Sequence, residues 1–226
     1  MHAGDVHHGE PGPLRLQKYI DRSILLSMVT DKGARTTARL VESMLELIQD
    51  RGYSGTGLNT VVEHAGAPKG SLYFHFPEGK EALGEKAVEL AAGHFHSLVA
   101  ELAADAASPG DVLRHVADVL AGILSDNDYR LGCPVSVVTL EMGAHSERLR
   151  TACAAAFESW IGPMTDHLVG RGHARETARA MAMTVVSTLE GAVIMSRARR
   201  DVAALRNAAL VLGALLDQPP AAEETS

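Results

Sequence analysis

The segment GAPKGSLYFHFPEGKEAL, residues 66–83, gathers three of the chain's few aromatic residues into four positions. The 226 residues include four Tyr, four Phe and one Trp, and three of these nine are Tyr73, Phe74 and Phe76. A hydrophobic core usually distributes its aromatic residues over several elements. A cluster inside one short element indicates that the element is anchored in the domain and also contacts something outside it.

Hydrophobic periodicity places this segment within a run of helices. Apolar residues recur with helical spacing over residues 36–51 and again over 58–65, and a glycine follows each predicted helix. A third, shorter helix is expected from about Pro68 to about Phe74, because proline is tolerated in a first helical turn. Helix, glycine-containing turn and short helix form the helix-turn-helix arrangement, whose second helix enters the major groove of DNA.

The side chains of the short helix should divide between two faces. Leu72 and Phe76 are expected to face inward and to hold a helix that is too short to be stable alone. The other residues are left for the outer face, where they could contact phosphates and base edges. These outer residues are Lys69, Gly70, Ser71, Tyr73 and His75. From spacing alone, the alternative is an ordinary helical corner in a bundle.

The rest of the chain also predicts helices. They are expected over about 79–105, 109–125, 132–142, 147–169, 174–198 and 201–216. No alternating apolar and polar run is long enough to indicate a sheet, so the expected fold class is all-α. The expected organisation is a disordered extension (1–34), a helix-turn-helix domain (35–80), a larger helical effector-binding and dimerisation domain (81–217) and a disordered tail (218–226). Met28, which a polar leader follows, is a second candidate translation start.

Composition and charge exclude several classes of protein. Hydrophobic residues make up 46% of the chain and aromatic residues 4%, which suits a helical core. The formal net charge of -7 argues against nonspecific coating of nucleic acid. The apolar stretch 180–195 contains Glu190 and is shorter than the ~20 residues that span a membrane. A soluble, cytoplasmic protein with Cys133 and Cys153 as buried, reduced thiols is therefore expected.

The segment TTARLVESMLELIQDRGYSGTGLNTVVEHAGAPKGSLYFHFPEGKEALGEKAV, residues 36–88, resembles the DNA-binding domain of TetR-type (tetracycline-repressor-like) transcriptional regulators. The resemblance rests on the small-residue turn, the run Gly-Ser-Leu-Tyr-Phe-His-Phe and the following Lys-Glu pair. GCPVSVVTLEMGAHSERLR (132–150) and TLEGAVIMSRARRD (188–201) resemble the ligand-binding half of the lincomycin-resistance-regulator-like (LmrA/YxaF) subgroup. The resemblance implies a dimeric, ligand-responsive repressor of a near-palindromic DNA operator.

The resemblance also implies DNA contacts for individual residues. Those implied to lie in the major groove are Lys69, Gly70, Ser71 and Tyr73. Tyr73 and His75 would bind phosphates, as would Lys80 at the start of the next helix. Thr56 would contact a phosphate through its hydroxyl and the helix dipole. Because eight acidic residues oppose six basic ones between residues 35 and 90, nonspecific binding should be weak and specific binding strongly salt-dependent.

The larger half is expected to hold an effector cavity, since DNA binding alone would not need the helices predicted over residues 81–217. Met and aromatic side chains adapt to irregular apolar ligands, so a small hydrophobic effector is expected. Trp160 is the best single candidate, and His94 is either a core histidine or a polar group in the pocket. The candidate lining residues are His94, Phe95, Leu98, Val137, Leu140, Phe157, Trp160, Met164, Met181 and Val185. For each residue the alternative is ordinary core.

The last two helices are expected to form the dimer surface, because apolar or small residues surround much of each helix. Two such helices from each subunit would build a four-helix interface. The candidate interface residues are Ala182, Leu189, Val193, Leu205, Ala209, Leu212 and Leu216. A two-fold dimer would present its two recognition helices about one DNA turn apart, roughly 34–36 Å.

Enzyme hypotheses find less support in the sequence. Cys133 with His145 or Glu141 could form a catalytic set, but nothing in the sequence places them together, and no glycine-rich phosphate loop or G-x-S-x-G motif occurs. His94 and His96 are two residues apart and point to different faces of a helix, so neither a metal site nor a cofactor is expected. The better alternative is a helical carrier of hydrophobic ligands without specific DNA binding.

Overall fold

The structure is a computed structural model that describes residues 32–219. Every regular element in this range is an α-helix, which confirms the all-α prediction. The nine described helices are α3 (Lys32–Arg51), α4 (Leu58–Ala65), α5 (Ser71–His75), α6 (Lys80–Ala104), α7 (Pro109–Asp126), α8 (Pro134–Met142), α9 (Glu147–Gly170), α10 (Arg175–Arg199) and α11 (Ala203–Leu216). The predictions about Met28, the extension up to residue 31 and the tail from residue 220 lie outside the described residues.

Two boundaries differ from those expected. Helix α3 begins at Lys32, so the domain boundary expected at residue 35 falls inside a helix. Helix α5 begins at Ser71, not near Pro68. Ahead of it the chain forms a turn in which the carbonyl oxygen of Pro68 accepts hydrogen bonds from the Ser71 backbone N–H (2.9 Å) and hydroxyl (2.7 Å). Pro68 therefore precedes the helix.

Gly66 makes the tight turn after α4. Its φ of 57° lies in the left-handed region, where a side chain is strained. The Ala67 backbone N–H donates to the carbonyl of Val62 (3.1 Å), which closes the helix end. Arg39 of α3 reaches this turn and donates to the carbonyls of Ala65 and Gly66. The expected glycine turn is thus present, and an arginine from another helix secures it.

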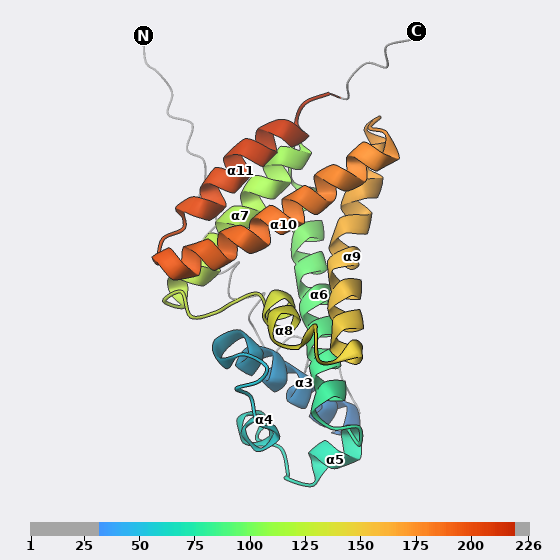
Figure 1. The fold of residues 1–226 in the computed structure, drawn as a ribbon, viewed down its shortest axis with the longest axis vertical. Coiled ribbons are helices and arrows are strands. Elements are labelled where there is room, and N and C mark those ends of the chain that lie inside the picture. Colours follow the sequence, from blue (N-terminus) through green and yellow to red (C-terminus); the bar gives the residue numbers. More distant parts are fainter. Residues whose placement is uncertain (1–31, 220–226) are drawn as a thin grey trace.

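Helices α3, α4 and α5 pack with the beginning of α6 at the lower end of the molecule in Figure 1. Their apolar faces form one core, which contains Leu40, Met44, Ile48, Val61, Leu72, Phe76 and Leu83. Leu72 and Phe76 are both buried, as predicted for the inward face of α5. The core continues upward through α8 and α9, so this unit is continuous with the rest of the chain.

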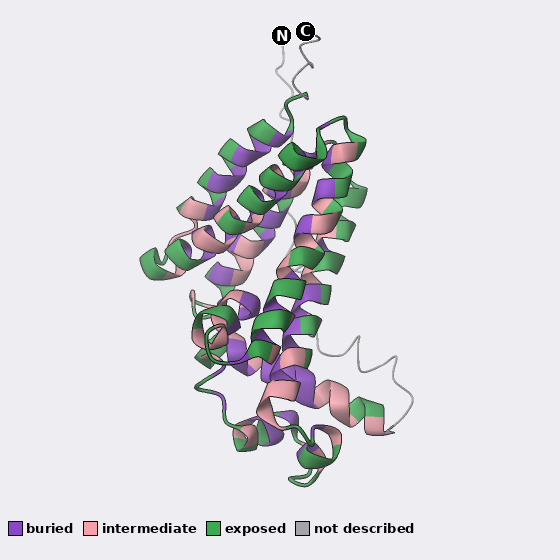
Figure 2. Cartoon of the chain, turned by 45° about the vertical axis from the view of Figure 1, so that its right-hand side comes forward, coloured by how far each residue is buried: buried purple, intermediate pink, exposed green. Residues whose placement is uncertain are grey.

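The upper part of the molecule is a bundle in which α7 packs against α11 and α10 packs against α9 and α11. A second core fills it, with Leu113, Leu124, Leu168, Leu189 and Leu205 among its members. Helix α6 links the two parts, because it contacts α3 at its lower end and α7 and α9 above. Figure 2 shows the inner faces of these helices buried and their outer faces exposed.

By length and composition, α10 is apolar enough to cross a membrane. In the fold, however, one side of it is covered, from Ala178 through Val185 and Leu189 to Ser196. It is therefore a core helix of the bundle, and core helices of soluble proteins satisfy the same criterion.

Leu72 and Phe74 allow the anchoring of α5 to be tested within one helix. Leu72→Ala should lower the free energy of unfolding by about 2–5 kcal/mol, because it opens a cavity under the helix. Phe74→Ala, at an exposed position, should change it by less than about 0.5 kcal/mol. Urea unfolding followed by circular dichroism measures both values. Equal losses would show that α5 is not held by its inner face.

Candidate nucleic-acid interface

Helix α5 and the turn before it lie at the lower end of the molecule in Figure 1. Lys69 and Gly70 on the turn are exposed, and Tyr73 on the helix is 65% exposed. Ser71 and His75 are half-buried. Lys69, Gly70 and Tyr73 are therefore accessible on or beside a helix whose other side is in the core. This arrangement leaves α5 able to enter a groove of DNA without losing its support.

The imidazole of His75 ties α5 to α3. Its Nδ1 lies 3.0 Å from the hydroxyl oxygen of Thr37, and that hydroxyl donates to the carbonyl of Gly33 (3.2 Å). When the Thr37 hydroxyl donates to Gly33, the Nδ1–H of His75 is the donor in the first bond. This hydrogen bond engages one of the two ring nitrogens of His75, so only Nε2 is left for a contact outside the protein.

Phe74 is the residue of this interface that sequence reasoning missed. It is 81% exposed, and its ring meets that of His75 edge to face with 5.0 Å between centroids. The spacing contained the signal, because Leu72 and Phe76 face inward and a residue two positions from each must point away from them. A large apolar ring is thus presented beside Tyr73 on the outer face.

Lys80 is only partly exposed, whereas a phosphate contact was expected of it. Its Nζ lies 4.3 Å from the centroid of the Tyr53 ring, and burial lowers the pKa of the ammonium, an effect that Glu141 partly opposes. Burial, with a smaller contribution from Glu81, raises the pKa of Tyr53 to about 12, so its phenol stays neutral. Lys80 must leave the face of this ring before it can reach a phosphate.

Thr56 does not hold the position expected of a phosphate contact. Its side chain is fully buried, and its hydroxyl donates to the carbonyl of Gly52 (2.7 Å). Its backbone N–H donates to the carbonyl of Tyr53 (3.1 Å). Helix α4 begins only at Leu58, after the N-cap Gly57. Thr56 therefore fastens the loop before α4, and both of its donors are already used.

The aromatic candidates for the effector pocket form a cluster between α6 and α9. The ring of Trp160 lies 4.8 Å from that of Phe95 and 5.5 Å from that of Phe157, measured between centroids. The indole N–H donates to the carbonyl of Ala92 (3.2 Å). His94 is half-buried nearby in the chain, and burial lowers the pKa of its imidazole. Leu98 is buried, while Met164 packs against the upper core.

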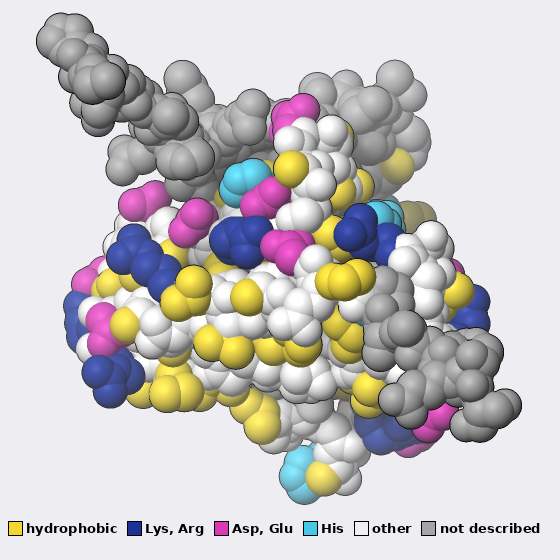
Figure 3. Space-filling model, turned by 90° about the horizontal axis from the view of Figure 1, so that it is seen from above, with side chains coloured by type: hydrophobic (Ala, Val, Ile, Leu, Met, Phe, Trp, Pro, Cys, Tyr) yellow, Lys and Arg dark blue, Asp and Glu magenta, His cyan; other side chains and the backbone are white. Residues whose placement is uncertain are grey.

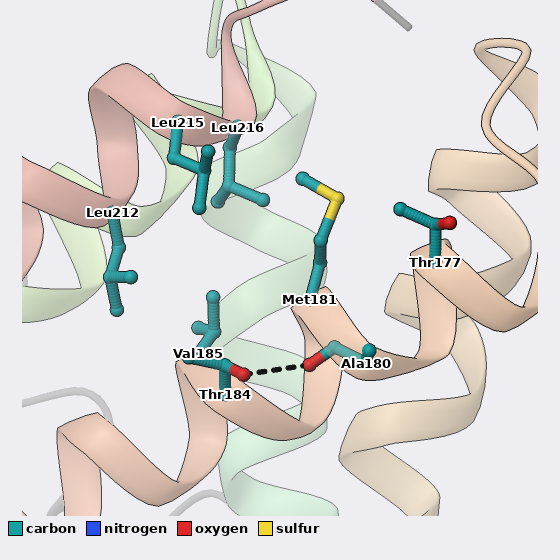
Figure 4. A pocket seen from close by; sticks show the side chains of 8 residues that line it. All are labelled: Thr177, Ala180, Met181, Thr184, Val185, Leu212, Leu215 and Leu216. Atoms are coloured by element: carbon teal, nitrogen blue, oxygen red, sulfur yellow. Dashed lines mark hydrogen bonds between the residues drawn. The ribbon is translucent and has the colours of Figure 1, made fainter. Parts of the chain in front are cut away.

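Four other candidates lie elsewhere, so the ten do not surround one cavity. Met181 and Val185 line a hollow of about 180 Å³ between α10 and α11, shown in Figure 4 with Leu212, Leu215 and Leu216 facing them. Thr184 turns its hydroxyl back to the carbonyl of Ala180 (2.8 Å), which leaves the lining apolar.

Val137 borders a separate, polar hollow of about 300 Å³, where α8 and Arg197 meet the end of α3. Leu140 is 76% exposed on α8 and lines neither of these hollows, so its assignment to a pocket does not hold. The two positions are three apart on a helix of nine residues. Only one face of α8 is covered, and Leu140 lies outside it.

The predicted dimer residues lie on the sides of their helices that face the core of this chain. Ala182, Leu189, Val193, Leu205, Ala209, Leu212 and Leu216 are between 0 and 8% exposed and belong to the core of this chain. The outer sides carry exposed apolar residues instead, between 43 and 67% exposed. They are Met183, Ile194, Met195, Leu210, Val211 and Leu215. Seen from above in Figure 3, hydrophobic side chains form bands across the upper bundle, with charged side chains along their margins.

Cys133 is half-buried and Cys153 is buried. Cys133 and Cys153 are free cysteines, and burial raises the pKa of both. The carboxyl of Glu190, from α10, lies close to Cys133 and Ser136 at the beginning of α8, and burial raises its pKa. Among the described residues, its Oε2 has no hydrogen-bond partner. The catalytic set considered for Cys133 gains no support, since the groups beside this thiol are Glu190 and Ser136.

Known proteins match both parts of the chain. Residues 40–87 match the family described as bacterial regulatory proteins of the tetR family, and residues 109–210 match the LmrA/YxaF-like C-terminal domain of transcriptional regulators. An uncharacterized HTH-type transcriptional regulator of Mycobacterium tuberculosis is 34% identical over 172 residues, which cover 74% of this chain and 87% of the relative. The HTH-type transcriptional regulator LmrA of Bacillus subtilis is 31% identical over 158 residues, 70% and 84% of the two chains.

Solved structures share the fold. A TetR transcriptional regulator from Chloroflexus aurantiacus superposes with a TM-score of 0.68 and 26% identity, covering 83% of this chain and 96% of the other. A regulatory protein TetR from Rhodobacter sphaeroides gives the same TM-score with 23% identity, over 78% and 96% of the two chains. The chain therefore belongs to the TetR family of bacterial transcriptional regulators, with a C-terminal domain of the LmrA/YxaF-like type, and it is not an enzyme.

Proposed function

We propose that this protein is a cytoplasmic, dimeric repressor that binds a near-palindromic DNA operator and releases it when a small hydrophobic effector binds. The observation that carries the proposal is the division of α5, which buries Leu72 and Phe76 and exposes Tyr73 and Phe74. A relative from Mycobacterium sp., 27% identical over 175 residues (74% of this chain and 86% of the relative), is named as the transcriptional repressor DhaR.

DNA contacts in this proposal come from a small set of groups. Lys69 and the backbone at Gly70 and Ser71 approach the major groove, while the Tyr73 hydroxyl bonds to a phosphate. The exposed ring of Phe74 suits the methyl group of a thymine, an apolar feature of the major groove. His75 contributes through Nε2, the ring nitrogen that does not face Thr37, and Lys80 contributes when it moves away from the Tyr53 ring. The affinity for DNA then depends on a few contacts, which each subunit of the dimer makes once.

The dimer interface in this proposal is the exposed apolar side of α10 and α11. Met183, Leu210, Val211 and Leu215 lie on that side, and the apolar hollow of Figure 4 opens between the same two helices. Exposed apolar area of this kind usually marks a site of protein association. A second copy of the chain, placed by a two-fold axis, would cover the same surface on both subunits.

The effector in this proposal enters between α6 and α9, at the cluster of Phe95, Phe157 and Trp160. Aromatic groups with one polar handle are typical of pockets for apolar ligands, and the neutral imidazole of His94 could supply that handle. Helix α6 carries any displacement there down to Lys80, directly after the recognition helix α5. A ligand that favours the displaced form lowers the affinity for DNA.

Selection of binding sites from a randomised DNA duplex pool tests the DNA-binding function. The wild-type protein should enrich one near-palindromic motif, and Tyr73→Ala should enrich none, because Tyr73 is exposed on α5 and contributes little to the core. Gel-mobility shifts on the selected duplex then measure affinity as salt concentration changes. A folded wild-type dimer that enriches nothing would instead support the carrier of hydrophobic ligands.

Deoxyuracil substitution tests the role of Phe74. Replacing each thymine of the selected operator by deoxyuracil removes one methyl group, and at one thymine per half-site this should weaken wild-type binding about fourfold, the value of one buried methylene. Phe74→Ala should bind less tightly and lose sensitivity at that thymine alone. Equal sensitivity of the two proteins at every thymine would show that Phe74 does not contact a methyl group.

An acidic residue on the outer side of α11 tests the dimer surface. Leu210→Asp should raise the dimer dissociation constant at least about tenfold, because the interface would bury an unpaired charge. Leu140→Asp is the matched control, since Leu140 is also highly exposed but lies on α8. Sedimentation velocity over a range of concentrations measures both. Dissociation by the control variant, or an unchanged Leu210→Asp dimer, would place the interface elsewhere.

A further inference from the structure

One short segment of the larger half holds both ends of the helix-turn-helix unit. This segment, called here the α8–α9 elbow, runs from Glu141 near the end of α8 to Arg148 in the first turn of α9. Its side chains reach the loop that enters α4 and the turn that leaves α5. These contacts lie outside the DNA-reading surface and outside the aromatic cluster.

At the entry side, the elbow fixes the loop before α4. Glu141 accepts a hydrogen bond from the backbone N–H of Ser54 at 2.6 Å. Ser54 belongs to the same loop that Thr56 fastens from within. Just before α8, the backbone N–H of Gly132 donates to the carbonyl of Gln49 near the end of α3 (3.1 Å). The approach to α4 is therefore held from the larger half at two points.

The elbow also contacts the turn that follows α5. The Arg148 guanidinium donates through Nη2 to Glu78, in the turn between α5 and α6, and through Nε to Glu85 (2.8 Å). Ser146, the N-cap of α9, donates to Glu81 at 2.7 Å. A guanidinium can hold two carboxylates in one fixed geometry. Since these pairs are partly exposed, they add little stability and act mainly on orientation.

The other end of α8 lies in the interior of the larger half. Cys133 and Ser136 at its beginning adjoin the buried carboxyl of Glu190 from α10. A helix of nine residues is a rigid link of about 13.5 Å. A shift of α8 at its buried end therefore moves Glu141, and with it the contact at the entry to α4.

We propose that the α8–α9 elbow sets the orientation of α5 relative to the larger half, with Arg148 and Glu141 as positioning residues. In a dimer, this orientation determines the distance between the two recognition helices, and hence the half-site spacing that the protein accepts. The inference rests on the proposed function, and it identifies the elbow as the segment that determines the half-site spacing. Without the elbow contacts, α5 keeps its reading surface and stays joined to the shared core, but its angle to the larger half is less firmly fixed.

The test is a duplex library that keeps the selected half-sites fixed and varies the spacer length between them. The wild-type protein should enrich one spacer. In Arg148→Ala, the preference for that spacer over one a base pair longer should fall at least about fivefold, the lower end of typical coupling between sites. Arg150→Ala is the matched control, because it removes the same charge but Arg150 pairs with Glu147 on its own helix. It should keep the wild-type spacing.

Conservative variants separate positioning from folding. Glu141→Gln keeps an acceptor for the Ser54 N–H and should retain the wild-type spacing, whereas Glu141→Ala should broaden it. Arg148→Glu combined with Glu78→Arg and Glu85→Arg reverses the pairs and should restore the spacing that Arg148→Ala loses. Half-site preference should be the same in all these proteins.

An Arg148→Ala protein that keeps the wild-type spacing would overturn the inference while leaving the proposed function intact. Loss of half-site preference together with spacing would also overturn it, because the defect would then lie in the reading surface. If the wild-type protein selects no site at all, the proposed function fails first, and the inference fails with it.

Discussion

The burial of Leu72 and Phe76 is the interaction that holds helix α5, the candidate DNA-binding helix, in place. Helix α5 has five residues, and so short a helix is unstable in water unless tertiary contacts hold it. Its direction is therefore set by its surroundings: the core of α3 and α4 beneath it, the Thr37–His75 hydrogen bond at its side, and the contacts at its two ends. These contacts therefore also determine where exposed residues of the helix, such as Tyr73 and Phe74, lie.

The chain's acidity shapes how the proposed DNA binding works. With a formal net charge of -7, the protein as a whole is repelled by DNA. Arg39 near the recognition helix is engaged with the carbonyls of the α4–α5 turn, and Lys80 lies against Tyr53. The proposed binding then relies on Lys69 together with hydrogen bonds and apolar contacts that only a matching DNA sequence supplies. Low charge in this region favours specificity over affinity for arbitrary DNA.

Much of the fold was predictable because glycine and proline mark most helix boundaries and apolar periodicity marks their interiors. The division of α5 followed from the same periodicity, since Leu72 and Phe76 are four apart. The start of α4 at Leu58 agrees with the predicted helix, but Thr56 lies two residues before it, in a buried loop. The hydrogen bond from its hydroxyl to Gly52 holds it there, and the sequence does not reveal that bond.

The faces of α10 and α11 could not be predicted for a different reason. Apolar residues surround both helices, so periodicity does not distinguish the side that packs on α7 and α9 from the side left exposed. Leu205 and Leu210 look equivalent in sequence, yet one is in the core and the other is on the surface. The same reasoning could not group the pocket candidates, because Trp160, Met181 and Leu140 lie in three different places and only packing separates them.

The partial exposure of the Arg148 pairs has a consequence for the protein in a living cell. Dissolved ions screen exposed charge pairs over about 8–10 Å at physiological ionic strength. The same ions compete for the phosphates of DNA. In the proposed dimer, a rise in salt concentration would therefore weaken binding to the operator and, through the elbow, make the distance between the two recognition helices less strictly defined. On the proposed function, salt concentration would then act on DNA binding independently of an effector.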